Sequence, residues 1–560
     1  MPVTTGRRAR KEGSRAGVAG AWGLTAMVAC ALALSGCDPA SLHGPLPAQW
    51  EAKIAGAVVA KPTVAQGSVY IGNWNSGHEL AFAETSGSLR WETNLGTTPG
   101  NCPDPVTQGV ASSPAVLNGT AYLGGGDVKW YALNATTGAV QWSFPVAPPP
   151  ATGNFNYSSP LLYSGHAYVG LASMCDNPLV QGKLLRVNLA THQVENVWKA
   201  VPDGQVGGTI WTNPVVDPAT NRIFVTTGTR QGTVQPDAQA IVSLDATTLA
   251  LQGAWSPPVT VGDQDWGTTP TLFTDANGRQ LVGGANKDGF FYALDRNNLG
   301  AGPVWRTRIA RGGPCPACGD GSISTAYFDG QRLVVAGGST TIGGKTFAGS
   351  ARALDPTTGV PRWEVGFGHV VLGGLVGQNG MVAVPENAAL YVLDDATGQT
   401  LYANDLQGLL DGSATLADGH LFIGTVTGRV SSRIFPLSAQ GVAGAAVRAA
   451  RARSPRSLRA ESTCAHSCRL TLGPRCMAIR LSTRTRVVRA VRARVLGADR
   501  RDDTLRVFAN AACAGRPALT LRTKGGSVHY AAPVPISVPV GRWVSVIATR
   551  SLALQATLVG

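Results

Sequence analysis

The sequence predicts an all-β protein, with an eight-bladed β-propeller over residues 46–436 and a small β-sandwich-like domain over residues 462–560. Three observations lead to this fold class. The 560 residues include 70 glycines and 35 prolines, which suits a chain of many turns better than a helical one. A hairpin pattern with an aromatic residue recurs eight times in the body. The C-terminal part alternates apolar and polar residues with period two.

Residues 1–36 have the features of an export signal: a basic start and then the apolar run "GVAGAWGLTAMVACALALSG". The run ends in "LSGC", where small residues before Cys37 resemble the bacterial lipobox. Cleavage there would leave a lipidated Cys37, with residues 37–45 as a tether. An ordinary signal peptide with an incidental cysteine is the alternative. We therefore expect an exported protein, lipid-anchored at the periplasmic or extracellular face of the cell membrane.

The net charge of +14 is unevenly distributed along the chain. Residues 1–36 carry +4, residues 37–435 carry −7 and residues 436–560 carry +17. Since the body is mildly acidic, it lacks the positive surface that binding to a polyanion needs. The sequence therefore predicts no nucleic-acid partner.

The propeller repeat is visible in stretches such as "YALNATTGAVQW" (131–142), "ARALDPTTGVPRW" (351–363) and "YVLDDATGQTLY" (391–402). Each predicts a strand, a tight turn and a return strand that carries an aromatic residue. The equivalent aromatics are Trp50, Trp91, Trp142, Trp198, Trp255, Trp305, Trp363 and Tyr402. We interpret them as packing between blades. The strand around Trp50 and the last hairpin, residues 419–435, are expected to close the propeller in one blade, which removes exposed edges.

The Ala-Leu-Asp-x-x-Thr-Gly-x-x-x-Trp pattern resembles the tryptophan-docking repeat of pyrroloquinoline quinone (PQQ) propellers. This resemblance implies the fold more strongly than a function, because such propellers serve both quinoprotein dehydrogenases and non-catalytic envelope scaffolds.

One tryptophan falls outside the repeat position. Trp211 follows Gly207, Gly208 and Thr209, and this Gly-Gly-Thr-x-Trp stretch resembles the one on which PQQ stacks in quinoprotein alcohol dehydrogenases. The resemblance implies that these four residues contact the cofactor. A tryptophan that simply fills the axial channel is the alternative.

Two stretches of the next blade resemble the same family, and their sequences are most similar to those of polyvinyl alcohol dehydrogenases. "DQDWGTTPTLF" (263–273) implies Asp265 as catalytic base, and "GGANKDGFFYALD" (283–295) implies Lys287 as the cation beside the quinone carbonyl. A carboxylate can take the proton of an alcohol while a cation stabilises developing negative charge. An aspartate in an ordinary loop and a solvated turn lysine are the alternatives.

The expected Ca²⁺ site departs from the family pattern. The family uses oxygen ligands, including an Asn at a strand end, where this chain has Thr229. Asp176 or Asn177 falls near the place of a second ligand, and Asp265 would be a third. Because a hydroxyl is a poorer ligand than a carbonyl oxygen, the sequence leaves Ca²⁺ binding open.

Past Cys37 the cysteines form one set of four in the body and one of four in the tail, which favours disulfides in an exported chain. Cys102 could bond Cys175. "CPACGDG" (315–321) allows a local disulfide, a redox dithiol or a metal knuckle. No Cys-x-x-Cys-His motif is present, so no c-type haem is expected.

Residues 437–461 form a basic, Ala/Arg-rich linker, and residues 462–560 alternate as a small disulfide-stapled β domain would. His466 in "CAHSC" raises zinc as an alternative to disulfides. The arginines of this domain are expected to be solvated on strand faces, with anionic lipid or a wall polymer as other possible contacts.

Three functions are compatible with these features. The first is a lipid-anchored, PQQ-dependent alcohol dehydrogenase that passes electrons to a separate acceptor. The second is a cofactor-free propeller that binds or assembles envelope proteins. The third is a ligand-binding protein that kept the pocket and lost the metal. Trp211, Asp265 and Lys287 favour the first, whereas Thr229 and the missing haem favour the others.

Overall fold

The computed structural model describes residues 41–99, 107–147, 153–231 and 235–437, and the backbone of eight strands beyond them. The chain divides into two compact units, residues 1–451 and 452–560. The predicted all-β fold is confirmed: the described part contains strands and two short 3-10 helices, η1 (Leu299–Ala301) and η2 (Pro316–Cys318). No helix among the described residues is long and apolar enough to cross a membrane.

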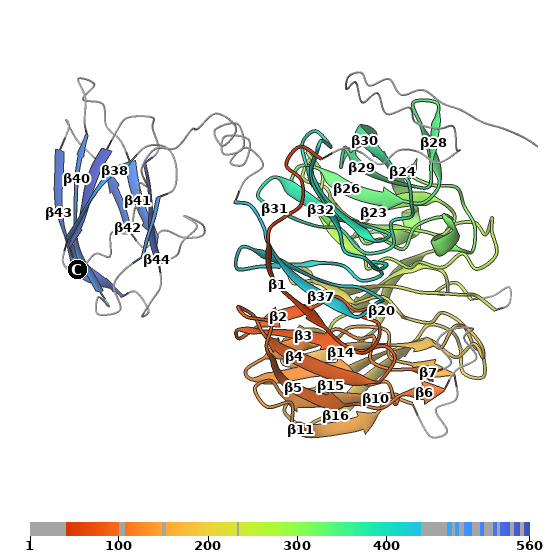
Figure 1. Cartoon of the computed structure of the whole chain (residues 1–560). Coiled ribbons are helices and arrows are strands. Elements are labelled where there is room, and N and C mark those ends of the chain that lie inside the picture. The colour runs from red at the N-terminus through yellow and green to blue at the C-terminus, as the bar shows by residue number, and fades with distance from the viewer. Residues whose placement is uncertain are drawn as a thin grey trace, which may run out of the picture. The chain divides into compact units, whose positions relative to one another are not determined.

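The first unit contains eight four-stranded antiparallel blades (Figure 1). Blade 1 is β2 (Thr63–Ala65), β3 (Ser68–Gly72), β4 (His78–Ala83) and β5 (Leu89–Asn94). Blade 2 is β8 (Ala115–Leu117), β9 (Thr120–Gly124), β10 (Lys129–Asn134) and β11 (Val140–Pro145). Blade 3 is β13 (Leu161–Tyr163), β14 (His166–Ser173), β15 (Lys183–Asn188) and β16 (Gln193–Lys199), with β12 (Asn154–Phe155) paired to the end of β14. Blade 4 is β17 (Val215–Asp217), β18 (Arg222–Thr226), β19 (Ile241–Asp245) and β20 (Leu251–Trp255).

Blade 5 is β21 (Thr271–Thr274), β22 (Gln280–Ala285), β23 (Phe290–Asp295) and β24 (Pro303–Arg308). Blade 6 is β25 (Tyr327–Phe328), β26 (Leu333–Gly337), β29 (Gly349–Leu354) and β30 (Pro361–Phe367), with an inserted hairpin of β27 (Thr340–Ile342) and β28 (Lys345–Phe347). Blade 7 is β31 (Val376–Gln378), β32 (Met381–Glu386), β33 (Ala389–Asp394) and β34 (Thr400–Asp405). Blade 8 is β35 (Thr415–Ala417), β36 (His420–Gly424), β37 (Arg429–Ile434) and β1 (Ala48–Lys53). A two-stranded sheet of β6 (Thr98–Pro99) and β7 (Thr107–Gln108) lies outside the blades.

Blade 8 closes the propeller as the sequence predicted. Strand β1 pairs antiparallel with β37, so that Trp50 lies opposite Ser432, and Figure 1 shows the two strands side by side. This pairing joins segments almost 400 residues apart and leaves no unpaired strand between the first and last blades.

The eight repeat aromatics pack between blades, as expected. Trp363 shows the arrangement: its indole N–H donates to the carbonyl of Asp395 at 2.9 Å, and its ring faces Gly398 in the turn of the next blade. Gly398 has a φ of 75°, and a Cβ there would lie 2.8 Å from the ring, so the turn requires glycine. Each apolar cluster accordingly combines neighbouring blades, as when Val334 of blade 6 packs with Val382 of blade 7.

The second unit holds two four-stranded antiparallel sheets, in the orders β38-β45-β40-β43 and β39-β44-β41-β42. This agrees with the predicted small β-sandwich-like domain. The strands are β38 (Ser467–Leu472), β39 (Met477–Arg480), β40 (Val487–Val495), β41 (Thr504–Phe508), β42 (Leu519–Arg522), β43 (Ser527–Ser537), β44 (Trp543–Ala548) and β45 (Leu554–Val559). The linker, His466 and the side chains of this unit lie outside the described residues, as do residues 1–40 with Cys37.

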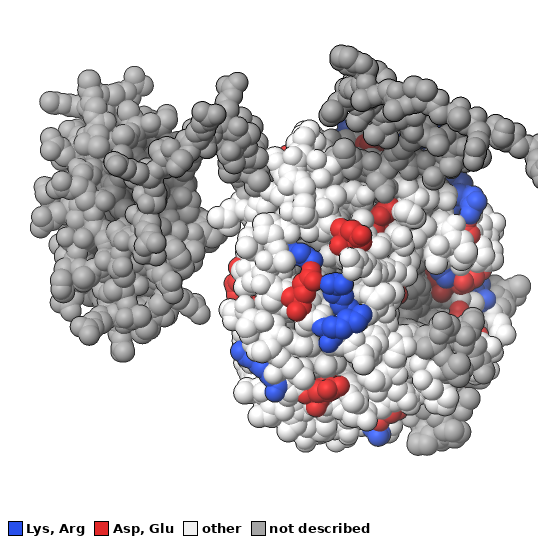
Figure 2. All heavy atoms as spheres, in the orientation of Figure 1, with Lys and Arg blue, Asp and Glu red and all other residues white. Residues whose placement is uncertain are grey.

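Charges on the propeller face in Figure 2 occur in small groups of both signs among uncharged residues. Such a group of both signs is formed where Arg429 and Arg433 of β37 pair with Glu51 of β1, although the figure does not label it. The view shows no broad surface of a single charge among the described residues.

Candidate functional site

A cavity of about 840 Å³ is lined by residues from all eight blades and therefore lies on the propeller axis. Equivalent positions, just before the first strand of each blade, supply two rings of lining residues. We call the first the wall ring: Val59, Ala111, Tyr157, Trp211, Gly267, Ile323, Leu372 and Asp411. We call the second, two residues further along the chain, the collar: Lys61, Ser113, Ser159, Asn213, Thr269, Thr325, Gly374 and Ser413.

The collar is a chain of hydrogen bonds that passes from blade to blade. The backbone N–H of Ser113 donates to the Ser159 hydroxyl at 2.9 Å, and that of Ser159 donates to the Asn213 side chain at 2.7 Å. The same link continues from Asn213 to Thr269 to Thr325, and another joins Gly374 to Ser413. A collar position therefore favours a short side chain with an acceptor oxygen, which Lys61 and Gly374 lack.

Trp211 belongs to the wall ring and lines the cavity without filling it. Its ring is half-buried, and the Lys287 ammonium lies 5.9 Å from the ring centroid. The edge of the indole occupies the space above Gly267, where a Cβ would lie only 2.6 Å from Trp211 Cη2. The glycine in blade 5 therefore makes room for the tryptophan of blade 4.

Asp265 and Lys287, the predicted base and cation, are brought together in blade 5. The Lys287 N–H donates to the Asp265 carbonyl at 3.2 Å, and the side chains approach to 3.7 Å between Nζ and Oδ2. The Asp265 side chain is 5% exposed and that of Lys287 10%. Gly228 permits this position, because a Cβ there would lie 3.0 Å from Asp265 Oδ2.

Three carboxylates converge beside Thr229. Asp176 from blade 3 and Asp265 from blade 5 contact the Thr229 hydroxyl at 2.6 Å and 2.9 Å. The third is Asp263, which the sequence reasoning missed; it lies 3.3 Å from that hydroxyl and 2.9 Å from the Lys287 ammonium. Its place in "DQDW", two residues before Asp265, is the signal that could have identified it.

Burial raises the pKa of Asp265 to about 7, with repulsion from Asp263 and Asp176 adding to it and Lys287 opposing it. A hydroxyl carries one proton, so Thr229 can donate to only one of the three carboxylates. The cluster thus contains more carboxylate oxygens than its own hydrogen-bond donors can satisfy.

This donor set fits a hard cation such as Ca²⁺. One oxygen from each of Asp176, Asp263 and Asp265 lies within 4.8 Å of the others, and three carboxylates with one ammonium leave a formal charge of −2. Carboxylate and hydroxyl oxygens are ligands that Ca²⁺ prefers. A planar quinone also fits, because the cavity offers the face of Trp211 beside these groups.

The residues of the predicted cofactor contact lie in different surroundings. Thr209 lines the cavity, but Gly207 and Gly208 are not among its lining residues. Gly208 instead donates to the Thr229 carbonyl at 2.8 Å and packs against Ala200, so both glycines serve contacts between blades 3 and 4. The resemblance identified the stretch but could not separate ring contacts from packing. Asn177 is exposed and does not line the cavity, whereas Asp176 does.

Cys315 and Cys318 form a disulfide across η2. The segment that contains this disulfide contacts the backbone of Lys287. The Gly313 N–H donates to the Lys287 carbonyl at 2.9 Å, and Gly321 packs against Lys287 Cα. Cys175 lines the cavity and is disulfide-bonded, while Cys102, its expected partner, lies outside the described residues.

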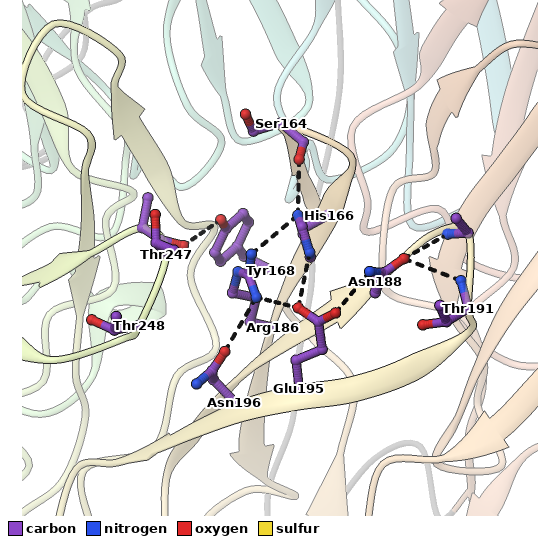
Figure 3. Close-up of polar contacts among 12 residues, drawn as sticks. Ser164, His166, Tyr168, Arg186, Asn188, Thr191, Glu195, Asn196, Thr247 and Thr248 are labelled. Atoms are coloured by element: carbon purple, nitrogen blue, oxygen red, sulfur yellow. Dashed lines mark hydrogen bonds and ion pairs between the residues drawn. The ribbon is translucent and has the colours of Figure 1, made fainter.

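A second cluster of charged groups lies on blade 3, away from the axial cavity (Figure 3). Glu195 of β16 accepts from Arg186 and from Asn188 at 2.7 Å, and it lies 3.0 Å from His166 Nε2. The Asn188 amide lowers the pKa of Glu195 most strongly. Because these groups satisfy one another across three strands, we assign the cluster a structural role.

Comparison with known proteins agrees with this architecture. A family model described as outer membrane protein assembly factor BamB matches residues 48–212 and 348–440. Over 286 residues the chain is 27% identical to the polyvinylalcohol dehydrogenase of Sphingopyxis sp. (strain 113P3), a match that covers 42% of each chain. The body of the chain is a PQQ-repeat β-propeller.

Solved structures show the same PQQ-repeat propeller fold. The quinohemoprotein alcohol dehydrogenase of Comamonas testosteroni has a TM-score of 0.56 and 15% identity, covering 75% of this chain and 80% of that chain. BamB from Moraxella catarrhalis has a TM-score of 0.50 and 15% identity, covering 70% and 100%. The matched part spans less than half the length of the curated relatives. At these identities the structures establish the fold alone.

Proposed function

We propose that this PQQ-repeat propeller is an exported alcohol dehydrogenase, with PQQ in the axial cavity and Ca²⁺ at the cluster of Asp176, Asp263 and Asp265. One observation carries the proposal: an aromatic platform, a buried carboxylate and an ammonium share one wall of the cavity beside a convergent set of oxygens. A propeller that only docks other proteins has no use for this combination. An alcohol is the proposed substrate, and a separate acceptor takes the electrons.

Each residue has a role that its position supports. PQQ, when bound, would supply the hydride acceptor. Trp211 offers its ring as the stacking surface, and Lys287 Nζ donates to negative charge that develops near it. Asp265 accepts the proton of the alcohol hydroxyl at a carboxylate oxygen.

A binding or assembly scaffold of the cell envelope is the second candidate, and the BamB family match favours it. That match leaves out residues 213–347, which contain Thr229, Asp263, Asp265 and Lys287. Within the propeller, the segment that the scaffold family does not match is therefore the one that supplies most of the candidate site.

The deciding experiment is reconstitution of the full-length protein with PQQ and Ca²⁺, followed by dye reduction with primary, secondary and polymeric alcohols. We expect turnover that Asp265→Asn abolishes while PQQ binding persists. A control, Asp405→Asn, changes an exposed aspartate that is not among the cavity-lining residues. Absence of both quinone absorbance and turnover would leave the scaffold function.

Thr229→Asn tests the metal site separately. An amide oxygen is a better Ca²⁺ ligand than a hydroxyl, so we expect tighter Ca²⁺ binding in calorimetry. Unchanged affinity would show that Thr229 does not face the cation.

We also propose that Cys37 carries the lipid anchor, on the strength of the "LSGC" pattern. Mass spectrometry of the protein from its native membrane should find an acylated N-terminal cysteine. Unmodified Cys37 in the mature protein would argue against the anchor.

A further inference from the structure

On the side of the cavity opposite Trp211 and Asp265, a second pair of charged residues lines the cavity. Lys61 is the charged member of the collar, at the entry to blade 1, and Asp411 is the charged member of the wall ring, at the entry to blade 8. Blades 8 and 1 lie four blades away from blades 4 and 5, which carry Trp211 and Asp265, so the two sets face each other across the axis.

These two residues come from segments in direct contact. Gly412 packs against the backbone of Val59 and Ala60, where a Cβ would lie 2.9 Å from each carbonyl oxygen. The Ser113 hydroxyl donates to the Lys61 carbonyl at 2.7 Å, which fixes the backbone of Lys61 from the other side. Both charged side chains are therefore attached to well-held backbone at the seam between blades 8 and 1.

Neither charged group is paired with another described group. Among the described residues, neither the Lys61 ammonium nor the Asp411 carboxylate takes part in an ion pair within 4.0 Å or a side-chain hydrogen bond. The charged groups at the opposite wall differ, because Lys287 is paired with Asp263 and Asp265.

The two charged groups differ in their surroundings, because Lys61 is exposed at the cavity whereas Asp411 is half-buried. Burial raises the pKa of Asp411, whose side chain can nevertheless be reached from the cavity. A charge in such surroundings is stabilised most by an opposite charge, since a neutral hydroxyl compensates it only in part. Neither residue is needed for the collar, whose links run through short acceptor side chains.

We propose that Lys61 and Asp411 form a binding site for a zwitterionic ligand that carries both an ammonium and a carboxylate group. Lys61 binds the carboxylate, with the hydroxyls of Ser113 and Ser413 beside it in the collar. Asp411 binds the ammonium, with the ring of Tyr157 elsewhere in the wall ring as an aromatic surface in the same cavity. A ligand of this class neutralises both charges at once, which neither a simple acid nor a simple amine can do. The site does not depend on the quinone.

Calorimetric titration of the full-length, quinone-free protein tests the proposal with three probes of matched length: 4-aminobutanoate, n-butylamine and butanoate. We expect the zwitterion to bind at least tenfold more tightly than either half-ligand. Equal affinities for the three probes would overturn the proposal without reference to any variant. The result is also independent of whether PQQ binds, so it can fail while the proposed function stands.

Variants then assign the two halves of the site. Lys61→Met should weaken 4-aminobutanoate and butanoate binding at least tenfold and leave n-butylamine unchanged, and Asp411→Asn should do the reverse for the half-ligands. Lys345→Met, in the β27–β28 hairpin, is the matched control and should bind all probes like the wild type. Far-ultraviolet circular dichroism checks that each variant is folded. Wild-type affinity for the zwitterion in both site variants would overturn the assignment.

Discussion

Gly267→Ala should displace Trp211 and so weaken PQQ binding. A Cβ at residue 267 would lie 2.6 Å from Trp211 Cη2 and 2.3 Å from Ile323 Cγ2. Carbon atoms pack at about 3.5–4.0 Å, so the indole and the isoleucine must each withdraw by about 1 Å. Overpacking of this kind costs about 1–3 kcal/mol of stability.

The effect on binding follows from the change in the stacking surface. A well-oriented aromatic pair is worth about 0.5–1.5 kcal/mol beyond its buried area, so misalignment should weaken PQQ binding about two- to tenfold. The assay is a PQQ titration at saturating Ca²⁺, followed by quinone absorbance, together with denaturant unfolding of the same samples.

Gly262→Ala is the matched control, because no atom lies within 4 Å of a Cβ at that position in the same loop region. It should change neither stability nor affinity. Adding Ile323→Ala to Gly267→Ala should restore part of the affinity by opening space for the new methyl group. If Gly267→Ala loses stability but binds PQQ like the wild type, Trp211 is not the stacking surface.

Three further changes address packing and charge. Trp363→Ala should lower the free energy of unfolding by about 3–5 kcal/mol, against less than about 2 kcal/mol for the half-buried Trp211→Ala; similar losses in denaturant unfolding would refute the distinction. The pKa of Asp265 is raised to about 7 in the folded state. The protonated carboxyl therefore makes its full contribution to the free energy of unfolding below about pH 4, and this contribution is lost as the pH rises to 7. In metal-free protein, stability relative to Asp265→Asn should therefore fall by about 4 kcal/mol between pH 4 and 7, and a flat difference would contradict the raised pKa. Burial raises the pKa of Glu79 well above its usual range, and neither carboxylate oxygen has a described partner, so Glu79→Gln should raise the melting temperature at pH 8 more than at pH 4. An equal shift at both pH values would contradict the raised pKa of Glu79.

The blades were predictable from the sequence because each hairpin carries its own turn signal and its own docking aromatic. "DPTTGVPRW" specifies the turn at Gly359 and the inward ring of Trp363 within nine residues. The closure of blade 8 followed as well, since Trp50 has the repeat aromatic but not the strands before it.

The site was predictable only in part, because its geometry depends on contacts between blades. Trp211, Asp265 and Lys287 follow from local motifs and do line the cavity. The packing of Gly207 and Gly208 between blades 3 and 4 could not be predicted, because a local motif does not show which neighbour a glycine packs against.

Lys61 and Asp411 were missed because they lie 350 residues apart and meet only at the closing seam. Aligning the blades on the residue before the first strand would have placed Asp411 at the level of Trp211. Aligning equivalent positions of the blades therefore identifies cavity-lining residues that no single motif reveals.

The most direct test of the central claim is a PQQ binding isotherm of the full-length protein at increasing Ca²⁺ concentration. The account predicts one PQQ per chain, an affinity that rises with Ca²⁺, and loss of that affinity in Trp211→Ala. Failure to bind PQQ at any Ca²⁺ concentration, or binding indifferent to both Ca²⁺ and Trp211, would contradict it.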